Sequence, residues 1–353
     1  MRRKALLVII LLLCVSALSA VSTDWFYNTL NRKQQELYNQ IGDAVLHCNE
    51  KVDDVSYDGS ECLRIYLGYL DDHPGIFWVE SGIQYGTYLE NGKTKHSIVF
   101  KYTHQDNLKA DQTRFINLVS KFSDYLKDDP NDYVKLYHVY DYLASTIEYS
   151  IDYPDQTMWS VFFEGVGVCA GFARSFQYLA LLEGIPAVVV HGYARNEDGS
   201  ASDIGHLWVM AEIDGKWYHF DPTWALSDSN GDVDFTYFCR SRKRMELTHV
   251  IDSDYPIPES TDDSLSYVKV TGRYLTVYSE KGVKEIIRKA LEKGDCSFTV
   301  EFSSLGELNK AIKSLIDEER LFAILQNLGR TDVTEVPYSF DDMAYSLTLL
   351  LRQ

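Results

Sequence analysis

Apolar residues recur at helical spacing in some stretches of the chain and alternate with polar residues in others. Residues 26–45 carry an apolar position every three or four residues, which predicts an amphipathic helix, and residues 133–147 repeat this pattern. Residues 83–89 and 96–102 are predicted to form a strand pair, with a turn at Asn91-Gly92. Helices and hairpins in this order indicate a mixed α+β fold.

Changes in pattern divide the chain into five segments. A leader over 1–22 precedes an N-terminal α/β region over 23–130 and a core over 131–252 that holds the candidate chemistry. The stretch 253–266 is polar and contains two prolines, so it is predicted to be a linker. Residues 267–353 alternate strand and helix patterns, beginning with a strand-like run over 267–279, and predict a small C-terminal α+β domain.

The leader has the form of a secretory signal peptide. Arg2, Arg3 and Lys4 form a positive head, and an apolar run from Ala5 to Ala20 follows. We expect cleavage between residues 19 and 23 and a secreted or cell-surface protein. The alternative is an uncleaved anchor, although the run is slightly short for a full span. Contact with a membrane is expected only if this segment is retained.

The chain is acidic, with 52 Asp and Glu residues against 34 Lys and Arg residues and a net charge of −18. Nucleic-acid binding requires a basic surface that neutralises phosphates. We therefore expect no nucleic-acid partner.

Six cysteines are present, and removal of Cys14 with the leader leaves five. An odd number in an exported protein indicates one free thiol. Cys48 with Cys62 is a local candidate disulfide, and Cys239 with Cys296 is a weaker one. No Cys/His spacing resembles a zinc site, and the acidic stretch 227–235 matches a calcium loop poorly. We therefore expect neither a metal nor an organic cofactor.

Cys169 stands where a glycine-rich stretch meets a helical pattern, in GVGVCAGFARSFQYLALLEGIP. Gly184 and Pro186 end the predicted helix. At a helix start, the unpaired N–H groups and the dipole favour a thiolate and can hold an oxyanion. Gly165, Gly167 and Gly171 are expected to leave room for a substrate chain. The alternative is a buried structural cysteine.

A base for this thiol is expected on the hairpin over 206–224, whose turn is predicted at Asp214-Gly215. With strands symmetric about that turn, His206 and Asp221 lie on one face as diagonal neighbours, close enough to hydrogen-bond. An aspartate in this position would orient the imidazole toward the thiol. His219 is the competing base, although we expect it to line the sheet surface, and His191 is expected to be structural.

The stretches VGVCAGFARSFQYLALLEGIPAVVV, GHLWV and DGKWYHFDPTW together resemble the core of the transglutaminase-like (papain-like thiol) superfamily, as in its secreted bacterial members. The resemblance covers residues 133 to about 225. It implies a cysteine-bearing helix packed on an antiparallel sheet, with Cys169 as nucleophile, His206 as base and Asp221 as orienting acid. Phe172 and Val209 stand where members often have tyrosine and asparagine. Weaker candidates for substrate or oxyanion contacts are Gly167, Ala170, Gly171, Trp208 and Trp159, the last of which fits a core aromatic better.

This triad predicts that Cys169 attacks an amide carbonyl of a peptide or protein substrate and forms a thioester. Resolution by water gives a cysteine peptidase or amidase, and resolution by a lysine amine gives a cross-linking transglutaminase. We favour hydrolysis, because the sequence contains no identifiable device for excluding water. A non-catalytic binding module on the cell surface is the alternative from another class.

Overall fold

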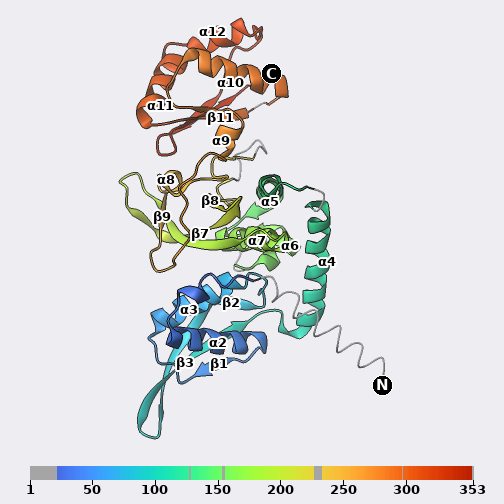
Figure 1. Cartoon of the computed structure of the whole chain (residues 1–353), viewed down its shortest axis with the longest axis vertical. Helices are drawn as coiled ribbons and strands as arrows, with labels where there is room; N and C mark the ends of the chain where they lie inside the picture. Colours follow the sequence, from blue (N-terminus) through green and yellow to red (C-terminus); the bar gives the residue numbers. More distant parts are fainter. Residues whose placement is uncertain (1–21, 127–128, 153–155, 226–232, 296, 352–353) are drawn as a thin grey trace.

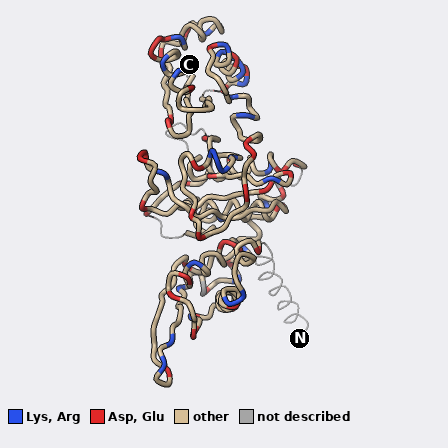
Figure 2. The backbone as a smooth tube through the Cα atoms, turned by 60° about the vertical axis from the view of Figure 1, so that its left-hand side comes forward, with Lys and Arg blue, Asp and Glu red and all other residues tan. Residues whose placement is uncertain are grey.

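A computed structural model describes residues 22–126, 129–152, 156–225, 233–295 and 297–351. These residues form three parts stacked along the long axis, with the N-terminal part at one end and the C-terminal part at the other (Figure 1). The predicted leader, Cys296 and most of the acidic stretch 227–235 lie outside the described residues. Within the described ranges, no helix is long and apolar enough to cross a membrane. Acidic and basic residues are interspersed along all three parts (Figure 2).

The N-terminal part packs two helices, α2 (Arg32–Leu46) and α3 (Gly59–Asp72), against a three-stranded antiparallel sheet. The strand order is β1 (Lys51–Asp53), β3 (Lys93–Tyr102) and β2 (Val79–Glu90), and a short 3-10 helix, η1 (Tyr27–Thr29), precedes α2. The predicted hairpin turn is confirmed, because Glu90 pairs with Lys93. Asn91 and Gly92 both have positive φ, as a two-residue hairpin turn requires.

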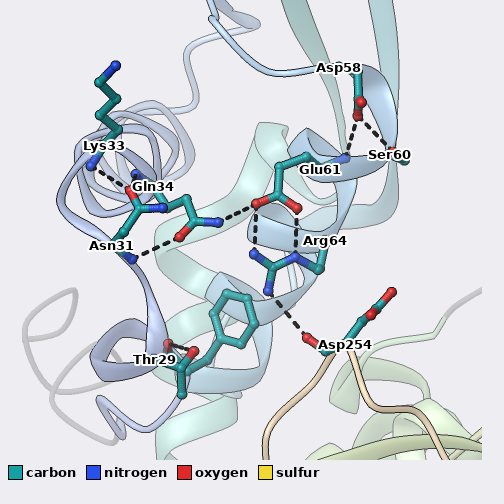
Figure 3. Close-up of polar contacts among 10 residues, drawn as sticks. Thr29, Asn31, Lys33, Gln34, Asp58, Ser60, Glu61, Arg64 and Asp254 are labelled. Carbon is teal, nitrogen blue, oxygen red and sulfur yellow. Dashed lines mark hydrogen bonds and ion pairs between the residues drawn. The ribbon is translucent and has the colours of Figure 1, made fainter.

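Polar contacts hold the start of α3 between α2 and the segment after the core (Figure 3). Asn31 caps α2, and the Gln34 side chain donates to Glu61 at 2.6 Å. Glu61 in turn accepts from Arg64, whose guanidinium also donates to the Asp254 carbonyl at 3.3 Å. The predicted linker therefore contacts the N-terminal part.

Helices connect the N-terminal part to the core. After η2 (Gln105–Asn107) come α4 (Leu108–Leu126) and α5 (Asp132–Thr146), and α5 confirms the helix predicted over 133–147. Strands β4 (Glu148–Tyr149) and β5 (Val166–Gly167) pair in parallel, and α6 (Met158–Glu164) lies between them in the chain. The cysteine helix, α7 (Cys169–Leu182), follows at once and ends before Gly184, whose φ is +78°.

The core sheet is antiparallel, in the order β8 (Lys216–Phe220), β7 (Ala201–Ile213), β6 (Ala187–Arg195) and β9 (His249–Ile251). Helix α7 packs against β6 and β7 (Figure 1). The mixed α+β class is thereby confirmed. The opposite face, which the sequence left out of the core, is also buried, by a cluster that includes Val188, Val190, Trp208, Met210, Tyr237 and Met245.

The C-terminal part has a hydrophobic cluster of its own. The strand order of its sheet is β10 (Tyr274–Leu275), β11 (Ser297–Phe302), β13 (Ser346–Leu350) and β12 (Tyr338–Asp341). Its helices are α10 (Glu280–Lys293), α11 (Leu305–Ile312), the π-helical η3 (Lys313–Asp317) and α12 (Arg320–Asn327). The strand predicted over 267–279 is wrong except at β10, because Tyr267–Val270 forms helix α9 and Gly272 turns the chain with φ +72°. Helix α8 (Arg242–Met245) lies between β8 and β9 in the chain.

Candidate active site

Cys169 is the first residue of α7. Its thiol faces the His206 side chain and the backbone N–H of Leu207, and both groups lower the pKa of the thiol. Val168, at the N-cap, provides no side-chain cap, and the Phe172 N–H makes a helical bond to the Val168 carbonyl at 3.1 Å. The amides that precede Phe172 in the first turn, those of Cys169, Ala170 and Gly171, therefore have no partner further back in the helix. They remain oxyanion candidates.

The hairpin places His206 beside Asp221. Ile213 pairs with Lys216 across the Asp214-Gly215 turn, which is the predicted register. His206 Nε2 lies 2.6 Å from Asp221 Oδ2, so the predicted hydrogen bond between imidazole and carboxylate is present. The structure thus brings together the three side chains that the sequence had selected.

The buried carboxylate of Asp221 accepts four hydrogen bonds. Oδ1 accepts from the backbone N–H groups of Thr223 and Trp224, at 2.9 and 3.2 Å. Oδ2 accepts from His206 and also from His249 Nε2, at 3.1 Å. Burial alone would raise the pKa of Asp221, but the charge and the hydrogen bond of His206, together with the hydrogen bond of His249, hold it well below its usual range.

The same contacts shift the other two groups of the triad in opposite directions. Burial opposes a charge on Cys169, but the hydrogen bond and the charge of His206, with the Leu207 N–H, lower its pKa overall. Burial likewise opposes a charge on His206, but the Asp221 carboxylate and the Cys169 thiolate raise its pKa overall. Both shifts favour a thiolate facing an imidazolium, and the thiolate is the nucleophilic form of a cysteine.

His249 was missed by reasoning from the sequence. It lies on β9, which joins the sheet by pairing with the end of β6, where Ala194 is opposite His249. The short stretch LTHVI carries no turn or periodic signal that would bring it to the hairpin over 206–224. The N–H of Leu207 was missed as well, because a backbone donor has no signal in the sequence.

His219 does not line the sheet surface, which corrects the prediction. It is fully buried, its Nδ1 accepts from Trp208 Nε1 at 3.0 Å, and burial lowers its pKa to about 3. The indole N–H of Trp208 is therefore already engaged, so Trp208 is wrong as an oxyanion donor. Its ring instead lies beside His206, with centroids 5.8 Å apart. His191 has structural contacts, as expected, in a 2.5 Å ion pair with Asp71.

The glycines before and after Cys169 serve helix packing, and not all of them leave room for substrate. A Cβ at Gly167 would lie 2.8 Å from Val161 Cγ2, and one at Gly171 would lie 3.0 Å from the same atom. Gly165 ends α6 in the left-handed region and faces open space. Trp159 is a core residue, because its buried ring packs 4.1 Å from that of Phe163.

The predicted Cys48–Cys62 disulfide is wrong, since both thiols are free, as are those of Cys169 and Cys239. Cys62 is fully buried on α3 and donates to the Tyr57 carbonyl at 3.6 Å. The inference of a single free thiol therefore fails as well. The weaker Cys239–Cys296 pair is wrong as well, because the thiol of Cys239 is free.

One group of donors among the described residues is compact enough for a metal ion. One atom each of His206, Asp221 and His249 lies within 4.8 Å of the others. Each oxygen of Asp221 already accepts two N–H groups, so we assign this group to the hydrogen-bond network of the triad and not to a metal.

Residues 120–222 match the family model of the Transglutaminase-like superfamily. This segment includes Cys169, His206 and Asp221, and over it the chain is similar to that superfamily. His249 lies outside the matched segment.

Three solved structures are similar over part of the chain. A candidate cysteine protease from Cytophaga hutchinsonii is 20% identical, with a TM-score of 0.27 over 43% of this chain and 65% of that one. A protein described as a TGase is 19% identical, with a TM-score of 0.28 over 42% and 45%. A candidate protease from Parabacteroides distasonis is 15% identical, with a TM-score of 0.24 over 42% and 36%. The matches thus span less than two thirds of each of these structures. No curated protein matches the chain.

Proposed function

We propose that this chain is an exported thiol enzyme that cleaves amide bonds of peptides or proteins through a thioester, as a cysteine peptidase or amidase. The observation that carries the proposal is the alignment of Cys169, His206 and Asp221. His206 Nε2 lies 2.6 Å from Asp221 Oδ2, the pKa of the Cys169 thiol is lowered by His206, and the pKa of the imidazole is raised. A structural cysteine needs neither a lowered pKa nor an oriented imidazole.

The chemistry follows from the positions of the groups. The Cys169 thiolate attacks the amide carbon, a C–S bond forms, and the carbonyl electrons move to oxygen, where first-turn amides of α7 stabilise them. The His206 imidazolium then donates its proton to the leaving amine as the C–N bond breaks, and a thioester remains. Neutral His206 next takes a proton from water, whose oxygen displaces the thiolate, so that the acid is released and the resting pair is restored.

Apolar side chains on both sides of the triad support an apolar substrate segment. Tyr149 pairs with Gly167, two residues before Cys169, and its side chain is 41% exposed. On the other side, Ile204 lies two residues before His206 on β7, where the pairing with β6 is irregular, and it is 80% exposed. Exposed apolar side chains around a polar centre are typical of sites that bind an apolar partner. We infer that residues next to the scissile amide are aromatic or aliphatic.

The proposal of export rests on the leader over 1–22, with its positive head and apolar run. The acidic remainder fits a protein that works outside the cell on peptide substrates and not on nucleic acids. A peptide or protein substrate is the partner that this proposal requires.

The experiment supplies glutamine-containing peptides with and without a labelled primary amine to the wild-type protein and to Cys169→Ala. We expect free acid or cleaved peptide from the wild type alone, with no label incorporated. Incorporation of the amine would contradict the proposed hydrolase activity and would indicate a cross-linking transglutaminase instead. If the wild type and the Cys169→Ala variant are equally inert, the enzyme proposal is overturned in favour of a binding module.

A further inference from the structure

His249 and His206 approach the same oxygen of Asp221 from two different strands. His206 on β7 lies 2.6 Å from Oδ2, and His249 on β9 lies 3.1 Å from it. The strand order places β6 between β7 and β9, so a side chain on β6 at this level would separate them. The residue there is Gly192, where a Cβ would meet the Trp208 ring at 2.6 Å. The missing side chain on β6 lets Trp208 lie across the strand and pack against His249.

The surroundings of His249 decide which nitrogen carries its proton. The ring is fully buried among aromatic rings, with centroids 4.2 Å from Trp224, 4.9 Å from Trp208 and 5.4 Å from Tyr237. Burial lowers its pKa, so the imidazole is neutral and has one N–H donor. A carboxylate only accepts, so that donor is Nε2. Nδ1 then has no proton and lies 2.9 Å from the Thr248 hydroxyl, which is also within 3.4 Å of the Met245 carbonyl.

We propose that His249 is a positioning residue of the active site, whose neutral Nε2–H holds the Asp221 carboxylate ionised and aimed at His206. This inference rests on the proposed function, because it assigns a role within the same triad. Without this donor, a fully buried carboxylate loses one of its four N–H groups. Its attraction for the His206 proton then weakens, and the Cys169 thiol becomes harder to ionise.

The other titratable groups near His249 do not replace it. His219 has its Nδ1 engaged by Trp208, and its pKa is lowered by burial, so it is neutral. Tyr237 is buried with a raised pKa, so it keeps its proton. His206 is the cation of the cluster, and Asp221 is the anion that both histidines contact.

The test compares His249→Met with His249→Gln in the full chain. Both side chains are unbranched and similar in size, but only glutamine retains an N–H donor at the end. The readout is the rate of Cys169 alkylation by iodoacetamide across pH. We expect His249→Met to lower the rate at neutral pH about tenfold, as loss of a hydrogen bond to a charged group predicts. In His249→Met, the pH below which the alkylation rate falls should also be higher than in the wild type. The rate of His249→Gln should remain within about threefold of the wild-type rate.

Equal rates in the wild type and His249→Met would overturn the proposal, and so would equal losses in both variants, which would indicate packing alone. If zinc copurifies in stoichiometric amount and its removal by chelation slows alkylation, the cluster is a metal site and the proposal fails. A wild-type thiol no more reactive than free cysteine would refute the proposed function itself.

If the His249→Met variant fails to fold, the proposal can still be tested on the wild-type protein through the tautomer of His249. Nitrogen-15 spectra of histidine-labelled protein should show His249 as the neutral Nε2–H tautomer, with the resonance assigned by its loss in His249→Gln. An Nδ1–H tautomer or an imidazolium would overturn the proposal.

Discussion

Asp71 and Arg174 form an ion pair that is buried between the N-terminal part and the helix that carries Cys169. Asp71 Oδ1 on α3 accepts from Arg174 Nη2 on α7 at 3.2 Å. The second oxygen, Oδ2, is 2.5 Å from His191 Nε2 on β6. One carboxylate therefore joins three elements of the fold, and the placement of the cysteine helix depends on the N-terminal part.

The substitution Asp71→Asn should reduce the free energy of unfolding by about 3–5 kcal/mol, because it leaves the Arg174 guanidinium buried without its counter-charge. Denaturant titration measures this change. The matched control is Asp54→Asn, which removes an exposed partner of Lys95 and should change stability little. Equal effects of the two substitutions would contradict the role given to the buried pair.

The same pair predicts a pH dependence. Burial alone would raise the pKa of Asp71, but His191 and Arg174 lower it overall. An acid with a lowered pKa stabilises the fold above its unfolded pKa of about 3.9 and loses that contribution as pH falls through the lower folded pKa. The stability difference between wild type and Asp71→Asn should therefore be constant from neutral pH down to about 5 and shrink below about 4. A difference that persists at the lowest pH would contradict this.

Cys169 should alkylate faster than the other described thiols at neutral pH, because His206 lowers its pKa and so favours the thiolate. Cys62 and Cys239 are internal controls, since both are buried with raised pKa values, that of Cys62 to about 11. Mass-spectrometric mapping after short exposure to iodoacetamide should find label on Cys169 before either of them. In His206→Ala, burial is no longer offset, so the acid limb should move above the ordinary thiol pKa of about 8.5. If the pH dependence of alkylation is the same in His206→Ala and in the wild type, His206 does not lower the pKa of Cys169.

The sequence predicted the placement of Cys169, His206 and Asp221 because each of these positions is set by residues near it in the chain. The Asp214-Gly215 turn sets the register that brings His206 and Asp221 to one face, and the helix signals after Cys169 place the thiol at an N-terminus. His249 could not be found this way, since its contact with Asp221 depends on β9 joining the far edge of the sheet.

The glycines around Cys169 show a second limit of the sequence. A glycine without positive φ can lack a side chain for two reasons: to leave room for a ligand or to leave room for a neighbouring residue. Here only the packing of α6 shows which reason applies. At Gly167 and Gly171 the neighbour is Val161. The disulfide prediction failed for a related reason, because spacing along the chain did not reveal that Cys62 faces the core.

Gly167→Ala should destabilise the fold and slow Cys169 alkylation, because the new Cβ would lie 2.8 Å from Val161 Cγ2 and push α6 away from the cysteine helix. Adding Val161→Ala removes the clashing methyl, so the double variant should recover part of what Gly167→Ala loses. Thermal unfolding of the four proteins in the cycle measures the coupling, which should be about 0.5–3 kcal/mol for residues in contact. Gly205→Ala is the control, since its Cβ meets open space and its φ is ordinary. Additive losses at 161 and 167 would refute the packing role.

Glu301 should anchor the C-terminal part to the core sheet, which carries His206. It is fully buried on β11 and forms ion pairs with Arg240, at 2.7 Å, and with Arg244. Arg240 in turn exchanges both backbone hydrogen bonds with His219 on β8, at 2.8 and 2.9 Å. Glu301→Gln leaves two buried guanidinium groups without their anion and should lower the free energy of unfolding by about 3–5 kcal/mol.

The control for this substitution is Glu285→Gln on α10, whose ion pair with Arg288 is exposed and contributes little. All six tryptophans, with Trp208 of the core sheet among them, precede residue 267. Their bands in near-ultraviolet circular dichroism therefore report on the rest of the protein and not on the C-terminal part, so the signal distinguishes two arrangements. If the C-terminal part is only tethered, Glu301→Gln leaves this transition where it is in the wild type. If Glu301 anchors the sheet through Arg240, the transition moves to lower denaturant, because the strand that leads to Asp221 loses its support.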